Sequence, residues 1–202
     1  MIQRLLGTPL LVVLFVLLTA GINKERSYDK YAKGSQSWVD SVFASLDENQ
    51  RLGQLFMVAA YSNKGDSHKR EIENLIKNYH IGGLIFFQGG PLRQARLLNH
   101  YQSLSKVPLF VAMDAEWGLG MRLDSTISFP RQIGLGAIKD DKLIYEMGEE
   151  VAYQCRRIGM QINFAPVVDI NFNPSNPVIG TRSFGENIIK VILRSCKVLI
   201  WP

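Results

Sequence analysis

The feature that most constrains the fold of this chain is an alternation of short apolar runs with longer amphipathic stretches. The apolar runs lie at 55–60, 84–87, 107–114 and 160–171. Near-continuous apolar strands that alternate with helices indicate parallel strands buried on both faces. The sequence therefore predicts an α/β fold with about four βα units.

The stretches between these strands have the periodicity of helices with one apolar face. Asp47 and Ser67 stand where helices are expected to begin, and both residue types are favourable N-caps. The longest helix is expected to bury a stripe formed by Leu143, Met147, Val151 and Cys155. Helices are predicted at 38–46, 67–80, 91–106 and 140–159.

Two ways of closing such a sheet fit the pattern, a doubly wound open sheet and a (β/α)₈ barrel. No G-x-G-x-x-G or phosphate-binding loop follows any of the strands, which weakens the nucleotide-binding version of the open sheet. Glycine-bounded strands with polar residues at their carboxyl ends favour the barrel, whose active sites lie on that face. We expect the N-terminal half of a TIM barrel.

Composition excludes several classes of function. Of the 202 residues, 47% are hydrophobic, which is enough for a sizeable core in one domain. The net charge is +5, but the lysines and arginines are scattered, so no nucleic-acid partner is expected. Cys155 and Cys196 are expected to be separate thiols. The three histidines, His68, His80 and His100, lack a second ligand at a useful spacing, so we expect no metal and no cofactor.

The N-terminus has the layout of a secretory signal. Arg4 precedes an apolar run at 5–18, and small residues follow before position 22. The run is short for a membrane span, which needs about 20 apolar residues. We expect residues 1–21 to be a signal peptide, or a membrane anchor through 5–18 if it is not cleaved, and 22–37 to be a polar linker. The chain is then exported, to the periplasm or the outside of the cell.

The stretch "LFVAMDAEWGLGMRL" ends an apolar strand in two carboxylates. Asp114 and Glu116 are two residues apart, so on a strand both side chains would face one side. Neighbours on one strand are poorly placed to flank a glycosidic bond as an acid/base pair. We therefore expect one to accept hydrogen bonds from a substrate and the other to support it. Trp117 could stack on a sugar ring, and a solvated strand-end turn is the alternative.

A second polar cluster follows the fourth strand in "APVVDINFNPSNPVIGTRSFG". Arg182 offers a planar fork of donors that suits a carboxylate, sugar hydroxyls or an acetamido carbonyl. Asp169 could hold the loop or pair with Arg182. A proline-stiffened loop with a surface arginine is the alternative interpretation of the same residues.

The two clusters together resemble the N-terminal barrel domain of glycoside hydrolase family 3, in its bacterial β-N-acetylhexosaminidase branch. The early family motif, (V/M)-D-x-E, is similar to "AMDAEWGLGMRL"; the later motifs resemble "APVVDIN", "NPVIG" and "TRSFG". The resemblance covers about 46–187. The sequence departs from the family where Trp117, Gly118 and Leu119 stand in place of part of E-G-G-R-V.

The resemblance implies roles for particular residues. Asp114 and Arg182 would bind the sugar at the cleavage point, and Glu116 would support them. Asp169 and Asn171 would organise the loop. The implied substrate is a terminal β-linked N-acetylglucosamine in a glycan, and the implied chemistry is retaining. The family's nucleophile and its K-H-F-P-G-H-G-type proton donor have no match in this chain, so we assign no catalytic residue and expect the chain to be inactive.

The tail at 188–202 looks atypical for the family, because it becomes apolar and basic on nearly every side. We expect a truncated frame, with residues after about Asn187 out of frame, and an open half-barrel that tends to self-associate. Two alternatives to the hexosaminidase remain: a β-glucosidase-type member of the family, and a noncatalytic sugar-binding module. An unrelated barrel enzyme is a third.

Overall fold

The computed structural model describes residues 27–173 and 175–199, and the chain divides into two units, 1–46 and 47–202. The predicted signal or anchor at 1–21 lies outside the described residues. Of the helices that are described, none combines the length and the apolar character needed to cross a membrane.

The first unit contains helix α2 (Ser27–Ser45), which begins inside the segment that we predicted to be a polar linker. We expected 22–37 to be a linker and a helix to begin at Trp38. The helix begins eleven residues earlier than predicted, and the polar segment contains no proline that would break it. Gln36 Nε2 donates a 2.8 Å hydrogen bond to Asp40 Oδ1 one turn away.

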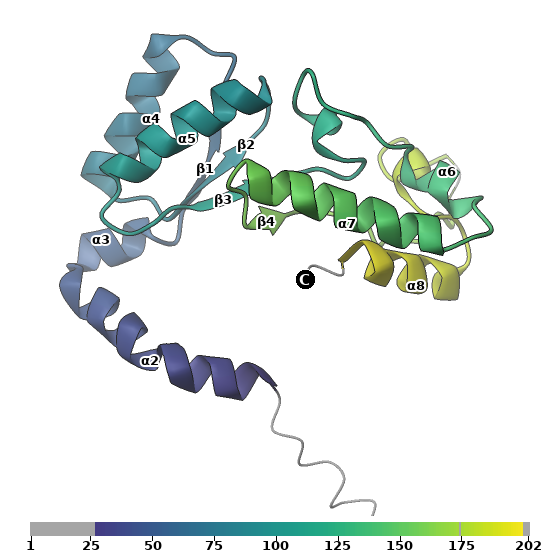
Figure 1. The fold of residues 1–202 in the computed structure, drawn as a ribbon, viewed down its shortest axis with the longest axis horizontal. Coiled ribbons are helices and arrows are strands. Elements are labelled where there is room, and N and C mark those ends of the chain that lie inside the picture. The colour runs from purple at the N-terminus through teal and green to yellow at the C-terminus, as the bar shows by residue number, and fades with distance from the viewer. Residues whose placement is uncertain (1–26, 174, 200–202) are drawn as a thin grey trace, which may run out of the picture. The chain divides into compact units, whose positions relative to one another are not determined.

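The second unit confirms the predicted α/β alternation (Figure 1). Its four strands pair in the order β1-β2-β3-β4, and every pair is parallel. The arrangement is that of half a TIM-like barrel. In chain order, the elements are α3 (Glu48–Gly53), β1 (Met57–Ala60), α4 (Asp66–Tyr79), β2 (Gly83–Phe86), α5 (Pro91–Leu104), β3 (Phe110–Met113), η1 (Leu119–Met121), α6 (Gln132–Gly136), α7 (Lys142–Arg157), β4 (Ile162–Asn163), η2 (Gly180–Arg182) and α8 (Ile188–Leu199).

The core lies between one face of the sheet and the helices. Alternate strand residues point to opposite faces, and the other face keeps Ile85 half-buried and Phe110 60% exposed. Helices α4 and α5 lie side by side (Figure 1). The buried side chains of the helix-covered face are Ala60, Leu84, Phe86, Val111 and Met113 from the strands, with Ile72, Ile76, Leu98, Tyr101, Ile144, Met147, Val151 and Cys155 from α4, α5 and α7.

Several predicted boundaries and stripes need correction. Helix α4 begins at Asp66 rather than after Ser67, because the carbonyl of Gly65 already accepts the first helical hydrogen bonds. In α7 the buried stripe starts at Ile144, while Leu143 is 54% exposed. At about 100° per residue, Leu143 lies about 120° around the helix from Cys155, whereas about 80° covers the buried stripe of Ile144, Met147, Val151 and Cys155. The Asp47 cap is confirmed, with a reciprocal capping box to Gln50.

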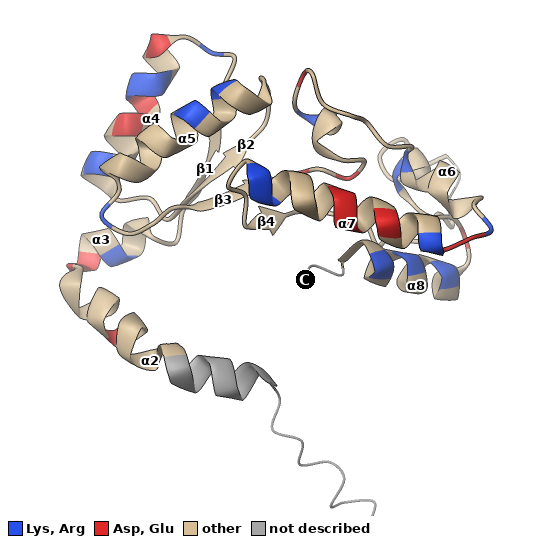
Figure 2. Ribbon diagram, viewed as in Figure 1, with Lys and Arg blue, Asp and Glu red and all other residues tan. Residues whose placement is uncertain are grey.

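The last helix, α8, corrects the prediction that the tail lacks a packing face. Val191, Arg194 and Ser195 are buried, and the helix packs on α7. Arg194 is tolerated there because its Nε donates to Asp141 at 3.1 Å and its amino groups donate to backbone carbonyls. Figure 2 shows the basic residues that run along α8. The buried face of α8 therefore includes a paired arginine.

Candidate functional site

The carboxyl end of β3 turns sharply and separates the two predicted carboxylates. The Asp114 side chain is 27% exposed, whereas Glu116 is only 3% exposed. Gly118 adopts φ +83, and its N–H donates to the carbonyl of Ala115, so the chain leaves the sheet direction here. Each carboxylate consequently meets a different arginine.

Glu116 pairs with Arg182, 66 residues further along the chain. The Nε of Arg182 donates to both carboxylate oxygens, at 3.1 and 3.0 Å, and its Nη2 donates to Oε1 at 2.7 Å. Such a forked contact fixes the plane of the guanidinium as well as its position. The carboxylate of Glu116, which we predicted to have a supporting role, holds the guanidinium of Arg182 near the end of β3.

The electrostatics place further carboxylates around Arg182. The hydrogen bond and the charge of Glu116 raise the pKa of Arg182, and the charges of Asp114 and Asp169 raise it further. Asp114 and Arg182, which we predicted to share one site, therefore lie within electrostatic reach of one another.

Asp114 itself pairs with Arg122, a residue that had no predicted role. Arg122 Nη2 donates to Asp114 Oδ2 at 2.7 Å. The Nε of Arg122 is buried and has no partner among the described residues. No local spacing in the sequence indicates this pair, because it depends on the turn at Gly118 between the two residues.

Trp117 is half-buried, and one of its faces is already occupied. The guanidinium carbon of Arg131 lies 4.5 Å from the centre of its ring. Arg131 also donates to the hydroxyl of Thr181 at 3.1 Å, next to Arg182. A sugar could stack on the other face of Trp117, so its predicted role stays a prediction.

The loop after β4 is held mainly through its backbone. The hydroxyl of Ser183, which is fully buried, donates to the carbonyl of Asp169 at 2.6 Å and lies 3.1 Å from that of Gly185. Asn171 N–H donates to the same Gly185 carbonyl at 3.0 Å. Ser183 was missed from the sequence, although it stands inside the quoted "TRSFG". The organising roles predicted for Asp169 and Asn171 remain predictions, because both residues make these contacts with Ser183 and Gly185 through their main chain.

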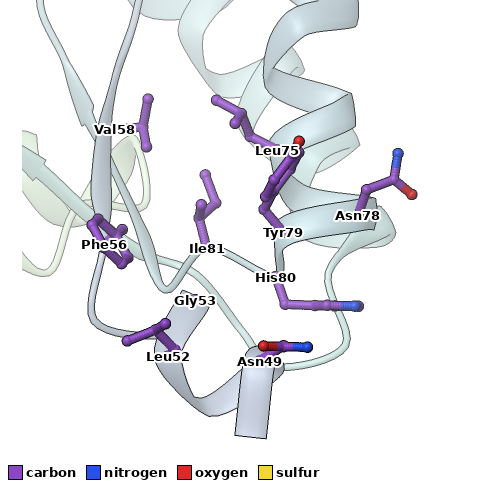
Figure 3. A pocket seen from close by; sticks show the side chains of 10 residues that line it. All are labelled: Asn49, Leu52, Gly53, Phe56, Val58, Leu75, Asn78, Tyr79, His80 and Ile81. Carbon is purple, nitrogen blue, oxygen red and sulfur yellow. The ribbon is translucent and has the colours of Figure 1, made fainter. Parts of the chain in front are cut away.

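A cavity of about 510 Å³ lies elsewhere, at the amino ends of β1 and β2 (Figure 3). Its apolar lining and its distance along the strands from Asp114 separate it from the charged cluster. In TIM barrels this end of the strands serves stability rather than chemistry. The cavity is lined by Asn49, Leu52, Gly53, Phe56, Val58, Leu75, Asn78, Tyr79, His80 and Ile81.

Two of the remaining sequence predictions concern cysteines and metals. Cys155, which is buried, and Cys196, which is exposed, are both free thiols, as predicted. Within 27–173 and 175–199, no group of three histidine, cysteine, aspartate or glutamate side chains could hold a metal ion.

Comparison with known proteins adds to this geometry. The sequence model of the glycosyl hydrolase family 3 N terminal domain matches residues 46–196. The chain belongs to glycosyl hydrolase family 3. The family match extends nine residues beyond Asn187, and the predicted change of frame after that residue stays a prediction.

The relatives of this family 3 chain include β-hexosaminidases. It is 32% identical to Beta-hexosaminidase A of Pseudoalteromonas piscicida, over 70% of this chain and 28% of that protein. It is 30% identical to Beta-hexosaminidase LpqI of Mycobacterium tuberculosis, over 71% of this chain and 37% of that protein. The chain therefore spans about a third of the length of these relatives.

A solved structure supports the same family and the same fold. The family 3 β-N-acetylglucosaminidase from Paenibacillus sp. str. FPU-7 is 32% identical and superposes with a TM-score of 0.67, over 76% of this chain and 30% of that one. The predicted family and the predicted half-barrel fold are both confirmed.

Proposed function

We propose that this family 3 chain binds a terminal β-linked N-acetylglucosamine residue through Asp114 and Arg182. The observation that carries the proposal is the forked Glu116–Arg182 pair, which fixes a guanidinium near the carboxyl end of β3, within electrostatic reach of Asp114. The names of the β-hexosaminidase and β-N-acetylglucosaminidase relatives support this choice of sugar.

The two side chains offer complementary hydrogen-bonding capacity. Asp114 can accept hydrogen bonds from sugar hydroxyls while Arg122 neutralises its charge. Arg182 commits its Nε and Nη2 to Glu116, and its Nη1 makes only a long 3.5 Å contact with the carbonyl of Val178. That Nη1 is the donor that would meet a sugar oxygen or the acetamido carbonyl, because a third of the Arg182 side chain is exposed.

The reaction that this site would serve is a retaining hydrolysis of the glycosidic bond. A carboxylate attacks the anomeric carbon while a separate group protonates the leaving oxygen, and water then releases the sugar. We assign neither role to a residue of this chain. Our proposal is that the chain by itself binds the sugar without cleaving the bond.

Calorimetric titration of the full chain with N-acetylglucosamine tests the proposal. Asp114→Asn and Arg182→Met should each weaken binding at least tenfold, because each removes a charge-assisted contact of about 1.5–3 kcal/mol. Asp124→Asn is the matched control: this exposed aspartate also pairs with an arginine, Arg93, but its side chain is not one of those proposed to bind the sugar. If the unaltered chain does not bind, or if Asp114→Asn binds equally well, the proposal is wrong.

Two further titrations separate the remaining alternatives. Glucose should bind much more weakly than N-acetylglucosamine; equal binding would favour a β-glucosidase-type site, and a Cellulomonas fimi relative, 26% identical, is named for both activities. Release of nitrophenol from 4-nitrophenyl β-N-acetylglucosaminide by the chain alone would refute binding without cleavage. A noncatalytic sugar-binding module would also release no nitrophenol. Joining the chain to the remaining part of a family 3 barrel distinguishes the two hypotheses. Cleavage should appear if the chain is part of a glycosidase domain, and should not appear if it is a sugar-binding module.

We also propose that residues 1–21 direct export. The support is the sequence pattern of Arg4 followed by the apolar run at 5–18. Sequencing the N-terminus of the chain recovered from the medium or periplasm should find it beginning near Gly21. Recovery in the membrane fraction with Met1 retained would favour the anchor, and recovery in the cytoplasm would contradict both.

A further inference from the structure

Three neighbouring strands end at the same level of the sheet, and each delivers one side chain there. Ala60 pairs with Phe86, and Ile85 pairs with Ala112. The residues that follow, Tyr61 after β1, Phe87 after β2 and Asp114 after β3, therefore lie side by side at the carboxyl edge. All three are half-buried.

These side chains form a continuous stack that ends at the Asp114 carboxylate. The rings of Tyr61 and Phe87 are 5.8 Å apart and inclined by 24°. The guanidinium carbon of Arg122 lies 4.8 Å from the centre of the Phe87 ring, and Arg122 Nη2 then reaches Asp114 Oδ2. Tyr61 also carries the ammonium of Lys64, 3.7 Å from its ring centre.

Comparison of the two arginines shows what the stack contributes. Arg182 is oriented by a forked contact that involves its Nε and Nη2. Arg122 makes one hydrogen bond to its carboxylate, and its buried Nε has no partner among the described residues. A single hydrogen bond leaves the guanidinium plane free to turn, whereas a flat aromatic face within about 6 Å restrains it.

We infer that Phe87, backed by Tyr61, is a positioning residue that orients Arg122 and, through it, the sugar-accepting carboxylate of Asp114. The loops after β2 and β3 are also joined directly, because Asp124 N–H donates to the carbonyl of Gly89 at 2.8 Å. The loop that follows Phe87 and the loop that follows Asp114 are therefore connected to each other. This inference rests on the proposed sugar-binding role of Asp114.

Phe87→Met is the first test, because methionine keeps most of the volume and removes the flat face. We expect it to weaken N-acetylglucosamine binding about fivefold, the equivalent of one exposed to half-buried cation–π contact. Phe87→Tyr should rescue binding to within about twofold, because it keeps the ring. Phe110→Met is the matched control, since Phe110 is 60% exposed on the same sheet face at the opposite end of β3.

A nuclear magnetic resonance signal separates positioning from mere support of the fold. The Nε–H of Arg122, assigned by its disappearance in Arg122→Lys, should be shifted upfield by the Phe87 ring in the free protein. That shift should be lost in Phe87→Met and retained in Phe87→Tyr and Phe110→Met. Should Phe87→Met fail to fold, Tyr61→Leu should reduce the same shift, because Phe87 loses its backing ring.

The sugar affinity and the chemical shift of the Arg122 Nε–H test the two proposals separately. If the unaltered chain shows the Arg122 shift but does not bind the sugar, the proposed function is wrong while the orientation of Arg122 by Phe87 stands. If Phe87→Met leaves the shift or the sugar affinity unchanged, the positioning role of Phe87 is overturned and the proposed function is unaffected.

Discussion

The Glu116–Arg182 pair should respond very differently to the loss of each partner. Arg182→Met leaves the Glu116 carboxylate, which is 3% exposed, without the guanidinium that compensates it. Breaking a buried pair in this way costs about 3 kcal/mol of unfolding free energy, the lower end of the usual range. Glu116→Gln leaves an arginine whose side chain is 34% exposed and can turn toward water. Its cost should be about 1 kcal/mol.

Urea unfolding, followed by tryptophan fluorescence and by circular dichroism, measures both costs. With a slope of roughly 2 kcal/mol per molar urea, the two midpoints should differ by about 1 M. The double variant Glu116→Gln, Arg182→Met should be more stable than Arg182→Met alone, because no buried charge is then left unpaired. Arg93→Met is the control: its partner Asp124 is also 2.6 Å away, but both side chains are more than half exposed, so the change should stay within about 0.5 kcal/mol.

The reasoning would be refuted by equal midpoints for the two single variants, or by a double variant whose cost is the sum of the single costs. Either result would mean that the carboxylate of Glu116 is stabilised by something other than Arg182. The pair would then not be the device that fixes the arginine at the end of β3.

Two other predictions follow from the burial of titratable side chains, and a third follows from the edges of the sheet. Burial raises the pKa of Tyr101 to about 12 from its ordinary 10.0; the unfolded chain therefore loses this proton first as pH rises, and stability should fall by about 1.4 kcal/mol per pH unit in that window. Tyr101→Phe should flatten this decline in urea unfolding between about pH 10 and pH 12. Burial also raises the pKa of Cys155 to about 11, so iodoacetamide at about pH 8 should label the exposed Cys196 quickly and Cys155 only after unfolding, as mass spectrometry can show. Finally, β1 and β4 are the edges of the described sheet, and we expect concentration-dependent association in analytical ultracentrifugation; a monomer at all concentrations would contradict this.

The sheet was predictable because each strand is a short apolar run. A chain that alternates such runs with amphipathic helices buries their side chains most readily as parallel strands. Strand ends were less predictable. β4 contains only Ile162 and Asn163, although the apolar pattern continues to Val168. The strand ends early because β4 pairs with β3 at only two positions, and beyond them the apolar side chains of Phe164 and Val168 are 52% and 60% exposed rather than buried.

The residues of the candidate site stand out in the sequence, whereas the contacts that they make with one another do not. Asp114, Glu116 and Arg182 stand out as polar residues beside buried strands, and the family motifs pointed to the same three. Which arginine meets which carboxylate depends on a turn at Gly118 and on a contact across 66 residues. Local spacing carries no information about such contacts. Arg122 was therefore assigned no role, and the fully buried Ser183 was not noticed.

The charges at the carboxyl end of β3 also bear on the kind of ligand that the site can hold. Arg122 and Arg182 are each matched by a carboxylate, Asp114 or Glu116, at 2.7 Å. A site whose charges are paired internally offers directional hydrogen bonds without a net field that would draw an ion, which suits a neutral, hydroxyl-rich molecule. Salt screens the attraction between a charged site and a charged ligand, but a neutral sugar has no such attraction to lose. The affinity for N-acetylglucosamine should consequently change less than about twofold when sodium chloride is raised to about 0.5 M, whereas an anionic ligand held by unpaired arginines would dissociate.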